Sequence, residues 1–158
     1  MQYDKQIVNL MGPMDDKRDG FDILIDHAPE KLPFVKQSLI KFANSHLANI
    51  GNYLYFAVPG VFLTLISGYT VSSIEDDFAD GVRLILLMGS LEGFFIPFYN
   101  FHIHPTTKEE KLENINYAFK LIEEIGLPSP RNRPNDVMAK DLKSILRVVY
   151  SLFIKYKN

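Results

Sequence analysis

Three stretches of the chain carry apolar residues at alternating spacings of three and four, which is the pattern of a helix with one buried face. We therefore predict three amphipathic helices, of which the last has the most regular stripe. The apolar positions are Leu32, Val35, Leu39 and Phe42 in the first, Leu112, Ile115, Phe119 and Ile122 in the second, and Leu142, Ile145, Leu146, Val149, Leu152, Phe153 and Tyr156 in the third.

A fourth helix is predicted without such a stripe. Residues 84–88 are all apolar, so a helix there has no solvated face and belongs in the middle of a helical core. The run is far too short to span a bilayer. Gly81, which we place in the first turn, lowers helix stability by about 1 kcal/mol relative to Ala. We interpret this glycine as a point where another helix backbone approaches closely.

Capping residues and prolines predict where these helices begin and end. Thr106 followed by Glu109 is a capping-box pattern ahead of the second stripe, and Gly126 is a natural C-terminal cap after it. Asp141 is a suitable N-cap for the last helix. Pro33 is compatible with the first helix because it falls in the first turn.

The rest of the chain adds one short helix and several connections. Residues 21–25 predict a short amphipathic helix that ends before Pro29. Residues 1–19 have no apolar periodicity, and we expect a linker there that can be disordered. Three prolines in residues 128–134 predict a loop. The chain is therefore predicted to be all-α, with a single folded domain over residues 20–158.

Composition narrows the classes of function. The chain has 158 residues and a net charge of −2, which is long enough for one core and gives no sign of nucleic-acid binding. Cysteine is absent, which removes disulfides and thiolate chemistry. The first residues lack the basic start and apolar core of a secretory signal. We expect a cytoplasmic protein without direct membrane insertion.

Candidate metal-binding residues are few. His102 and His104 resemble an alternating metal-binding pair, because a strand would place both imidazoles on one face. Loop histidines ahead of a proline are the preferred interpretation, since few other ligands are near in sequence. Asp76, Asp77 and Asp80 lack the spacing and the closing Glu of a calcium loop. We interpret them as an acidic cluster that favours the positive end of a helix dipole.

Residues for catalysis are also missing from the sequence. It contains no Gly-rich phosphate loop and no nucleophile elbow. Arg131 and Arg133 could grip a phosphate, although a Pro-rich surface loop usually carries such residues for solvation. We therefore expect neither an enzyme nor a bound cofactor or metal.

Three segments, taken in order and spacing, resemble the calponin-homology (CH) domain. They are residues 78–87 (FADGVRLILL), 111–119 (KLENINYAF) and 141–150 (DLKSILRVVY). Residues 21–32 (FDILIDHAPEKL) narrow the resemblance to the second, C-terminal CH domain of the parvin family. It covers most of residues 20–158.

The resemblance implies a fold and a function. The fold is a compact bundle of four main helices with short connecting helices and an N-terminal linker helix. The function is that of a non-catalytic adaptor at integrin adhesion sites of the cytoskeleton. In this family the second CH domain binds the kinase-like domain of integrin-linked kinase and the Leu-Asp (LD) motifs of paxillin. The alternative is a CH domain that binds actin filaments directly.

An LD motif is an acidic amphipathic helix, whose recognition needs an apolar groove with basic rims. The resemblance implies a groove between the linker helix, the first CH helix and the last helix, in which Lys31 and Lys157 would face the acidic partner. The same residues could instead only close the core, and Val35 also lies on a core stripe. The positions assigned to LD-motif binding are Gly20, Ile23, Lys31, Val35, Tyr150, Ile154 and Lys157.

For the kinase-like partner, the resemblance implies a contact at the aromatic residue that follows the turn at residues 91–93. Phe94 and Phe95 are adjacent there, so one can be buried while the other is displayed as a binding anchor. Phe95 is the predicted contact, with Phe94 beside it. Either ring could also belong to the core.

Residues 52–68 do not fit the resemblance and contain no charged residue. The parvin pattern would continue from residues 46–51 directly into residues 69–74. The codons at both ends of the segment can contain intron donor and acceptor sequences. We hypothesise that the segment is a translated intron, which sequencing of the transcript would decide. The alternative is a genuine loop that contacts a membrane or a partner.

Overall fold

The computed structural model describes residues 5–7, 20–50, 69–93 and 96–157, and all regular structure in these ranges is helical. The predicted all-α fold is therefore confirmed. The long helices are α3 (Leu32–Leu47), α7 (Val82–Glu92), α8 (Lys108–Glu124) and α10 (Leu142–Tyr156). The shorter ones are α2 (Gly20–His27), α6 (Ile74–Asp77), α9 (Pro134–Met138) and the 3-10 helices η1 (Pro29–Lys31) and η2 (Phe98–Asn100).

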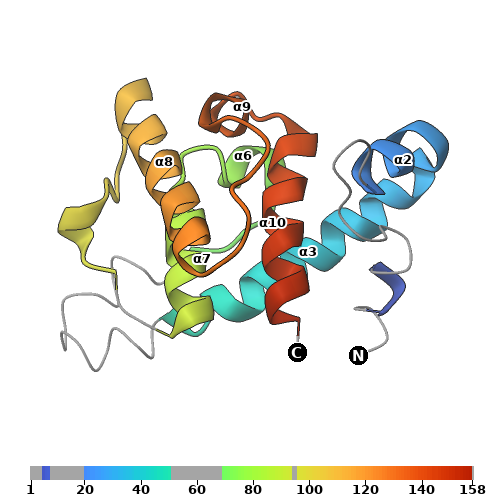
Figure 1. The fold of residues 1–158 in the computed structure, drawn as a ribbon, viewed down its shortest axis with the longest axis horizontal. Helices are drawn as coiled ribbons and strands as arrows, with labels where there is room; N and C mark the ends of the chain where they lie inside the picture. Colours follow the sequence, from blue (N-terminus) through green and yellow to red (C-terminus); the bar gives the residue numbers. More distant parts are fainter. Residues whose placement is uncertain (1–4, 8–19, 51–68, 94–95, 158) are drawn as a thin grey trace.

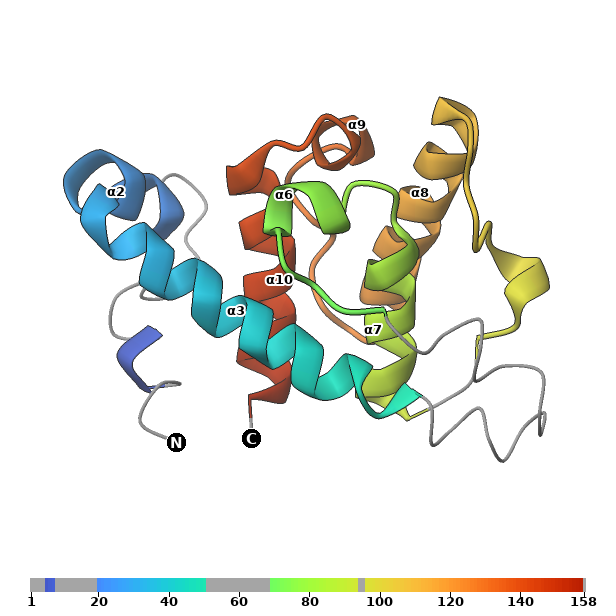
Figure 2. The ribbon, with the colours of Figure 1, turned by 180° about the vertical axis from the view of Figure 1, so that it is seen from behind.

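Helix α7 lies at the centre of the fold. It packs against α8 on one side and α3 on the other, and α10 contacts α3, α6 and α9. Helix α3 runs obliquely across α7 and α10, with α2 at its N-terminal end (Figures 1 and 2). Residues 84–88 of α7 are all buried, as the unbroken apolar run predicts. Among the described helices, none combines the length and the apolar character needed to cross a membrane.

Gly81 corrects one detail of the predicted fourth helix. It is the N-cap residue of α7 with φ of +81°, and not a residue of the first turn, so it does not weaken the helix. A Cβ atom at this position would lie 2.7 Å from Cβ of Asn114 and 2.9 Å from backbone atoms of Asn114 and Ile115. The predicted close approach of another helix is confirmed, and that helix is α8.

The helix ends follow the predicted caps with one shift. Asp141 accepts a hydrogen bond from the backbone N–H of Ser144 at 3.1 Å, as expected of an N-cap. For α8 the N-cap is Thr107, which accepts from the backbone N–H of Glu110 at 3.1 Å, and not Thr106. Two adjacent threonines precede two adjacent glutamates, so the capping pattern fits two registers. Gly126 follows α8 with φ of +90°.

The N-terminal linker is described only in part. Residues 5–7 are helical, and Ile7 is fully buried and belongs to the hydrophobic core. Residues 1–4 and 8–19 lie outside the described residues. Helix α2 contains the predicted amphipathic helix and ends before Pro29.

The two flanks of the predicted insertion are joined by side-chain hydrogen bonds. Asn44 of α3 donates from Nδ2 to the carbonyl of Val71 at 2.9 Å and accepts from the N–H of Val71 at 2.7 Å. The backbone N–H groups of Ser72 and Ser73 donate to Asp77 at 2.8 and 2.9 Å. The chain is therefore bound to the rest of the fold at Val71, three residues after the segment ends. Residues 52–68 themselves lie outside the described residues.

Deleting residues 52–68 is expected to preserve the fold. The Asn44–Val71 pair closes the connection from both sides, and a change in loop length alters stability by only about 0.6 kcal/mol per doubling. We expect an unchanged helical circular dichroism spectrum and a cooperative thermal transition. Asn44→Ala in the shortened chain should lower its melting temperature, which serves as the control. A shortened chain without a cooperative transition would show that the segment is needed for folding.

Candidate functional site

The linker helix α2 is attached to the last helix through an aromatic contact. The rings of Phe21 and Tyr150 meet edge to face, with centroids 5.3 Å apart and an interplanar angle of 87°. Both side chains are buried, and burial raises the pKa of Tyr150 to about 12. Contacts of this geometry stabilise beyond the area that they bury. Helix α2 is therefore part of the folded domain.

An ion-pair cluster reinforces the same attachment. Asp22 of α2 accepts from Nη2 of Arg147 at 3.2 Å on both carboxylate oxygens, and from Nζ of Lys143 at 2.7 Å. The two cations lie one helical turn apart on α10, so both reach the same carboxylate. Sequence reasoning missed this cluster, because more than a hundred residues separate its partners and no local pattern connects them.

The residues predicted to bind an LD motif lie on elements that contact one another. Gly20 and Ile23 belong to α2, Lys31 ends η1, and Val35 belongs to α3. Helix α10 contacts both α2 and α3, and η1 contacts both of them too. The remaining predicted residues lie along the C-terminal half of α10 and at its C-cap, and they are Tyr150, Ile154 and Lys157.

These residues differ in how they meet solvent. Ile23 is 50% exposed and Ile154 is 38% exposed, and with Tyr99 they are the large hydrophobic side chains exposed among the described residues. Val35 and Tyr150 are buried, at 0% and 1% exposure. Of the predicted residues, Ile23 on α2 and Ile154 on α10 therefore present apolar surface to solvent, whereas Val35 and Tyr150 belong to the core.

Two of the predicted residues are lysines. Lys31 is exposed at the end of η1, and Lys157 is partly exposed at the C-cap of α10. Lys155, also on α10, donates to the carbonyl of Ile125 at 2.7 Å and is thus engaged with the loop that follows α8.

The second predicted surface is described only around its edges, because Phe94 and Phe95 lie outside the described residues. The preceding turn is confirmed, since Gly93 ends α7 with φ of +70°. Beyond the two rings, Ile96 is buried and Tyr99 is 89% exposed. An exposed aromatic side chain therefore follows the predicted contact by four positions in the sequence.

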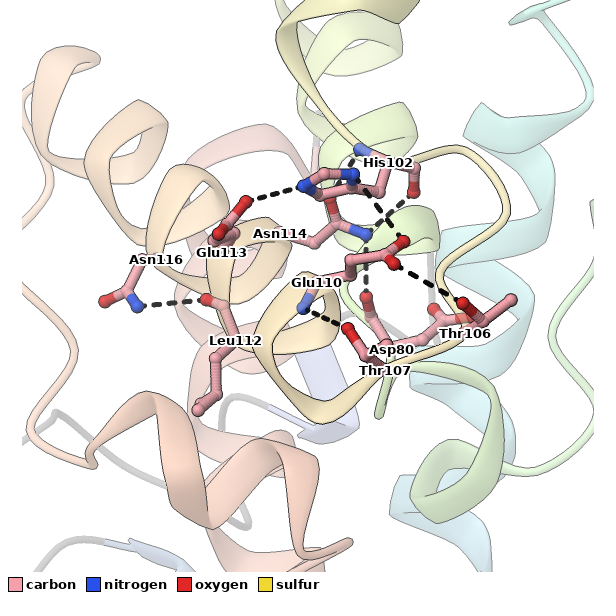
Figure 3. Close-up of polar contacts among 9 residues, drawn as sticks. All are labelled: Asp80, His102, Thr106, Thr107, Glu110, Leu112, Glu113, Asn114 and Asn116. Atoms are coloured by element: carbon pink, nitrogen blue, oxygen red, sulfur yellow. Dashed lines mark hydrogen bonds and ion pairs between the residues drawn. The ribbon is translucent and has the colours of Figure 1, made fainter.

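The loop that follows η2 is bound to α8 by Asn114 (Figure 3). The Asn114 side chain is fully buried, accepts from the N–H of His102 at 2.8 Å, and donates to the carbonyls of His102 at 2.8 Å and Asp80 at 3.1 Å. One amide side chain thus joins the loop, the start of α7 and the middle of α8. Sequence reasoning missed Asn114, although a polar residue among the apolar positions of α8 is a signal.

The histidine pair does not come together as a metal site. His102 lies between two glutamates of α8, with Nε2 2.6 Å from Glu113 and Nδ1 3.7 Å from Glu110, whereas His104 is exposed (Figure 3). Both histidines lie in a loop, which confirms the preferred interpretation. In the described part of the chain, no group of three or more His, Cys, Asp or Glu residues is arranged to hold a metal ion.

In the described structure the buried helix α7 packs against α3 and α8, and α10 packs against α3. The family model of the calponin homology (CH) domain matches residues 33–158, and the chain belongs to this family.

Within the CH family the chain is a homologue of the parvins. It is 45% identical to human beta-parvin over 142 residues, which cover 90% of the chain and 34% of beta-parvin. It is 43% identical to Paralyzed arrest at two-fold protein 6 of Caenorhabditis elegans, over 89% of the chain and 33% of that protein. Mouse gamma-parvin is 36% identical over 99% of the chain and 43% of its own length. The chain therefore spans between a third and less than half of the length of these relatives.

Proposed function

We propose that the chain is a non-catalytic adaptor domain of a cytoskeletal adhesion protein, and that it binds a short acidic amphipathic helix of the LD type. The proposed surface is the strip around Ile23 and Ile154, formed by α2, η1, α3 and α10. The observation that carries the proposal is the attachment of α2 to α10 through Phe21 and Asp22. It keeps Ile23 on a fixed helix and leaves two isoleucines exposed.

The chemistry of the strip selects the kind of partner. An amphipathic helix buries its apolar face against exposed apolar side chains and keeps its charged residues at the rim. Ile23 and Ile154 supply apolar surface, and Lys31 and Lys157 supply cations. Rim charges chiefly accelerate association and reject partners of the wrong sign. Paxillin-type LD motifs have the required acidic and apolar composition.

The proposed second partner is the kinase-like domain of integrin-linked kinase, with Phe95 as the contact and Phe94 beside it. Exposed Tyr99 near the same turn supports an aromatic contact surface, since aromatic residues are enriched at binding hot spots. A pull-down with the purified kinase-like domain tests this interface. Failure to retain the chain at micromolar concentrations would contradict it and leave the LD-type surface unaffected.

Direct binding to actin filaments is the competing function for a CH domain. Co-sedimentation of the chain with filaments discriminates between the two. We expect the chain to remain in the supernatant at concentrations where the LD-type peptide is bound. Pelleting that saturates with filament concentration would favour the actin-binding function.

Reversing the charge of both lysines, Lys31→Glu with Lys157→Glu, should lower the affinity for an acidic LD-type peptide by about tenfold. Each reversed contact changes the free energy of binding by roughly 0.5–1 kcal/mol. Isothermal titration calorimetry measures this. The melting temperature should hardly change, because exposed charges contribute little to stability. Lys120→Glu, an equal charge change at an exposed position of α8, is the matched control. Equal affinities for the double variant and the unaltered chain would contradict the proposed surface.

A further inference from the structure

The loop between α8 and α9 carries the one Ser-Pro or Thr-Pro dipeptide of the chain, at Ser129 and Pro130. Residues 127–130 have no regular secondary structure, and Ser129 is exposed. Prolines precede and follow the serine, which restricts this stretch to extended conformations. An exposed hydroxyl on an extended segment is open to an enzyme that must grip the residues on both sides of it.

Two cations of α10 hold the loop at its ends. Lys155 donates to the carbonyl of Ile125 at 2.7 Å, and Nη1 of Arg147 lies 3.5 Å from Oδ1 of Asn132. The loop accordingly runs alongside α10 (Figure 1). Ser129 lies between these two points in the sequence. It is therefore presented by a segment whose path is set by the helix beside it.

The charges around Ser129 favour a phosphate. Arg131 and Arg133 are both exposed, and residues 127–135 contain no acidic residue. A phosphoserine carries about −1.5 to −2 charges near neutral pH and forms charge-assisted hydrogen bonds with guanidinium groups. A phosphate on Ser129 would therefore have two guanidinium groups within four residues of it in the sequence.

We propose that Ser129 is a phosphorylation site for a proline-directed protein kinase. In the reaction Oγ of Ser129 attacks the γ-phosphorus of ATP, and the bond from that phosphorus to the β,γ-bridging oxygen breaks. ADP leaves, and the hydroxyl proton passes to the catalytic base of the kinase. The product is a phosphate ester three residues from Asn132, on the loop that Arg147 contacts.

The position of Arg147 gives this modification a structural consequence. Its guanidinium group contacts Asn132 of the loop and Asp22 of α2 at the same time. A phosphate dianion on the loop competes with the single charge of Asp22 for this group. Phosphorylation therefore weakens the attachment of α2 to α10.

The first experiment treats the purified chain with ATP and a purified proline-directed kinase and locates phosphate by mass spectrometry. We expect phosphate at Ser129, none in Ser129→Ala, and a rate lower by about tenfold in Pro130→Ala. Ser151→Ala, a serine of α10 outside any Ser-Pro sequence, should react like the unaltered chain. A peptide of residues 124–134 serves as a reference substrate. Phosphorylation of the peptide but not of the folded chain would overturn the proposal, as would failure of both.

The second experiment compares hydrogen exchange in the phosphorylated chain and in Ser129→Ala taken through the same kinase reaction. We expect the amides of α2 to exchange about threefold faster or more after phosphorylation, because α2 opens locally more often. The amides of α8 should be unaffected. Equal exchange rates of the α2 amides in both samples would overturn the proposal that the phosphate competes with Asp22 for Arg147.

Discussion

Replacing Gly81 with Ala is expected to lower the free energy of unfolding by about 3 kcal/mol or more. A side chain at φ of +81° is strained, at roughly 1–3 kcal/mol. The added Cβ would also lie 2.9 Å from backbone atoms of Asn114 and Ile115, which are too close for a real contact. These atoms belong to the buried side of α8, so they cannot move aside without displacing the helix.

Urea unfolding followed by circular dichroism measures the Gly81 effect, and the melting temperature should fall by about 10 °C. Gly126→Ala is the matched control, because Gly126 has φ of +90° but nothing within 4 Å of an added Cβ. Its free energy of unfolding should fall by about 1 kcal/mol, which is the effect of backbone strain alone. An equal loss in the two variants would mean that close helix packing at Gly81 is not the cause.

The second large effect is expected from Asn114→Ala. This substitution leaves the N–H and carbonyl of His102 and the carbonyl of Asp80 without their partner in a partly buried place. Each unsatisfied backbone group costs about 1–3 kcal/mol, less where water enters the new cavity. We therefore expect a loss of about 3 kcal/mol in the free energy of unfolding.

Two further variants separate hydrogen bonding from volume at Asn114. Asn114→Asp keeps the size but replaces a donor with a carboxylate oxygen facing two carbonyls, so it should be at least as destabilising as Ala. Asn116→Ala, on the same helix, removes an exposed amide that donates only to Leu112 of its own helix, and should change stability by less than about 0.5 kcal/mol. A stable Asn114→Asp variant would contradict the role assigned to the amide.

The fold could be predicted from the sequence because the buried residues of each helix form a regular apolar pattern in the sequence. The stripes of α3, α8 and α10 and the unbroken apolar run of α7 predict which residues face the core. Most of these residues are buried, whereas Leu32, Leu112, Leu142 and Tyr156 are only partly buried. Helix ends are less certain where two registers offer the same cap. Thr106 and Thr107 both precede a glutamate at the right distance, and only the path of the loop selects Thr107.

The candidate site could be predicted less completely, because it depends on contacts between distant segments. Phe21 and Ile23 stand two residues apart in one short helix, yet the first is buried and the second is half exposed. That difference arises from the position of α10. No pattern within the sequence of α2 indicates this position. The same holds for Asp22 with Arg147 and for Asn114 with His102. The resemblance supplied the positions of the proposed site, whereas the structure supplied their exposure.

The attachment of α2 to α10 also determines how the domain would respond to mechanical tension. Helix α2 begins at Gly20 and α10 ends at Tyr156, so they lie near the two ends of residues 20–157, and they contact each other directly. A pulling force applied at residue 20 and residue 157 therefore loads the Phe21–Tyr150 and Asp22–Arg147 contacts before it reaches α7. Helix α2 would peel away first, and the central helices would be shielded until it had done so.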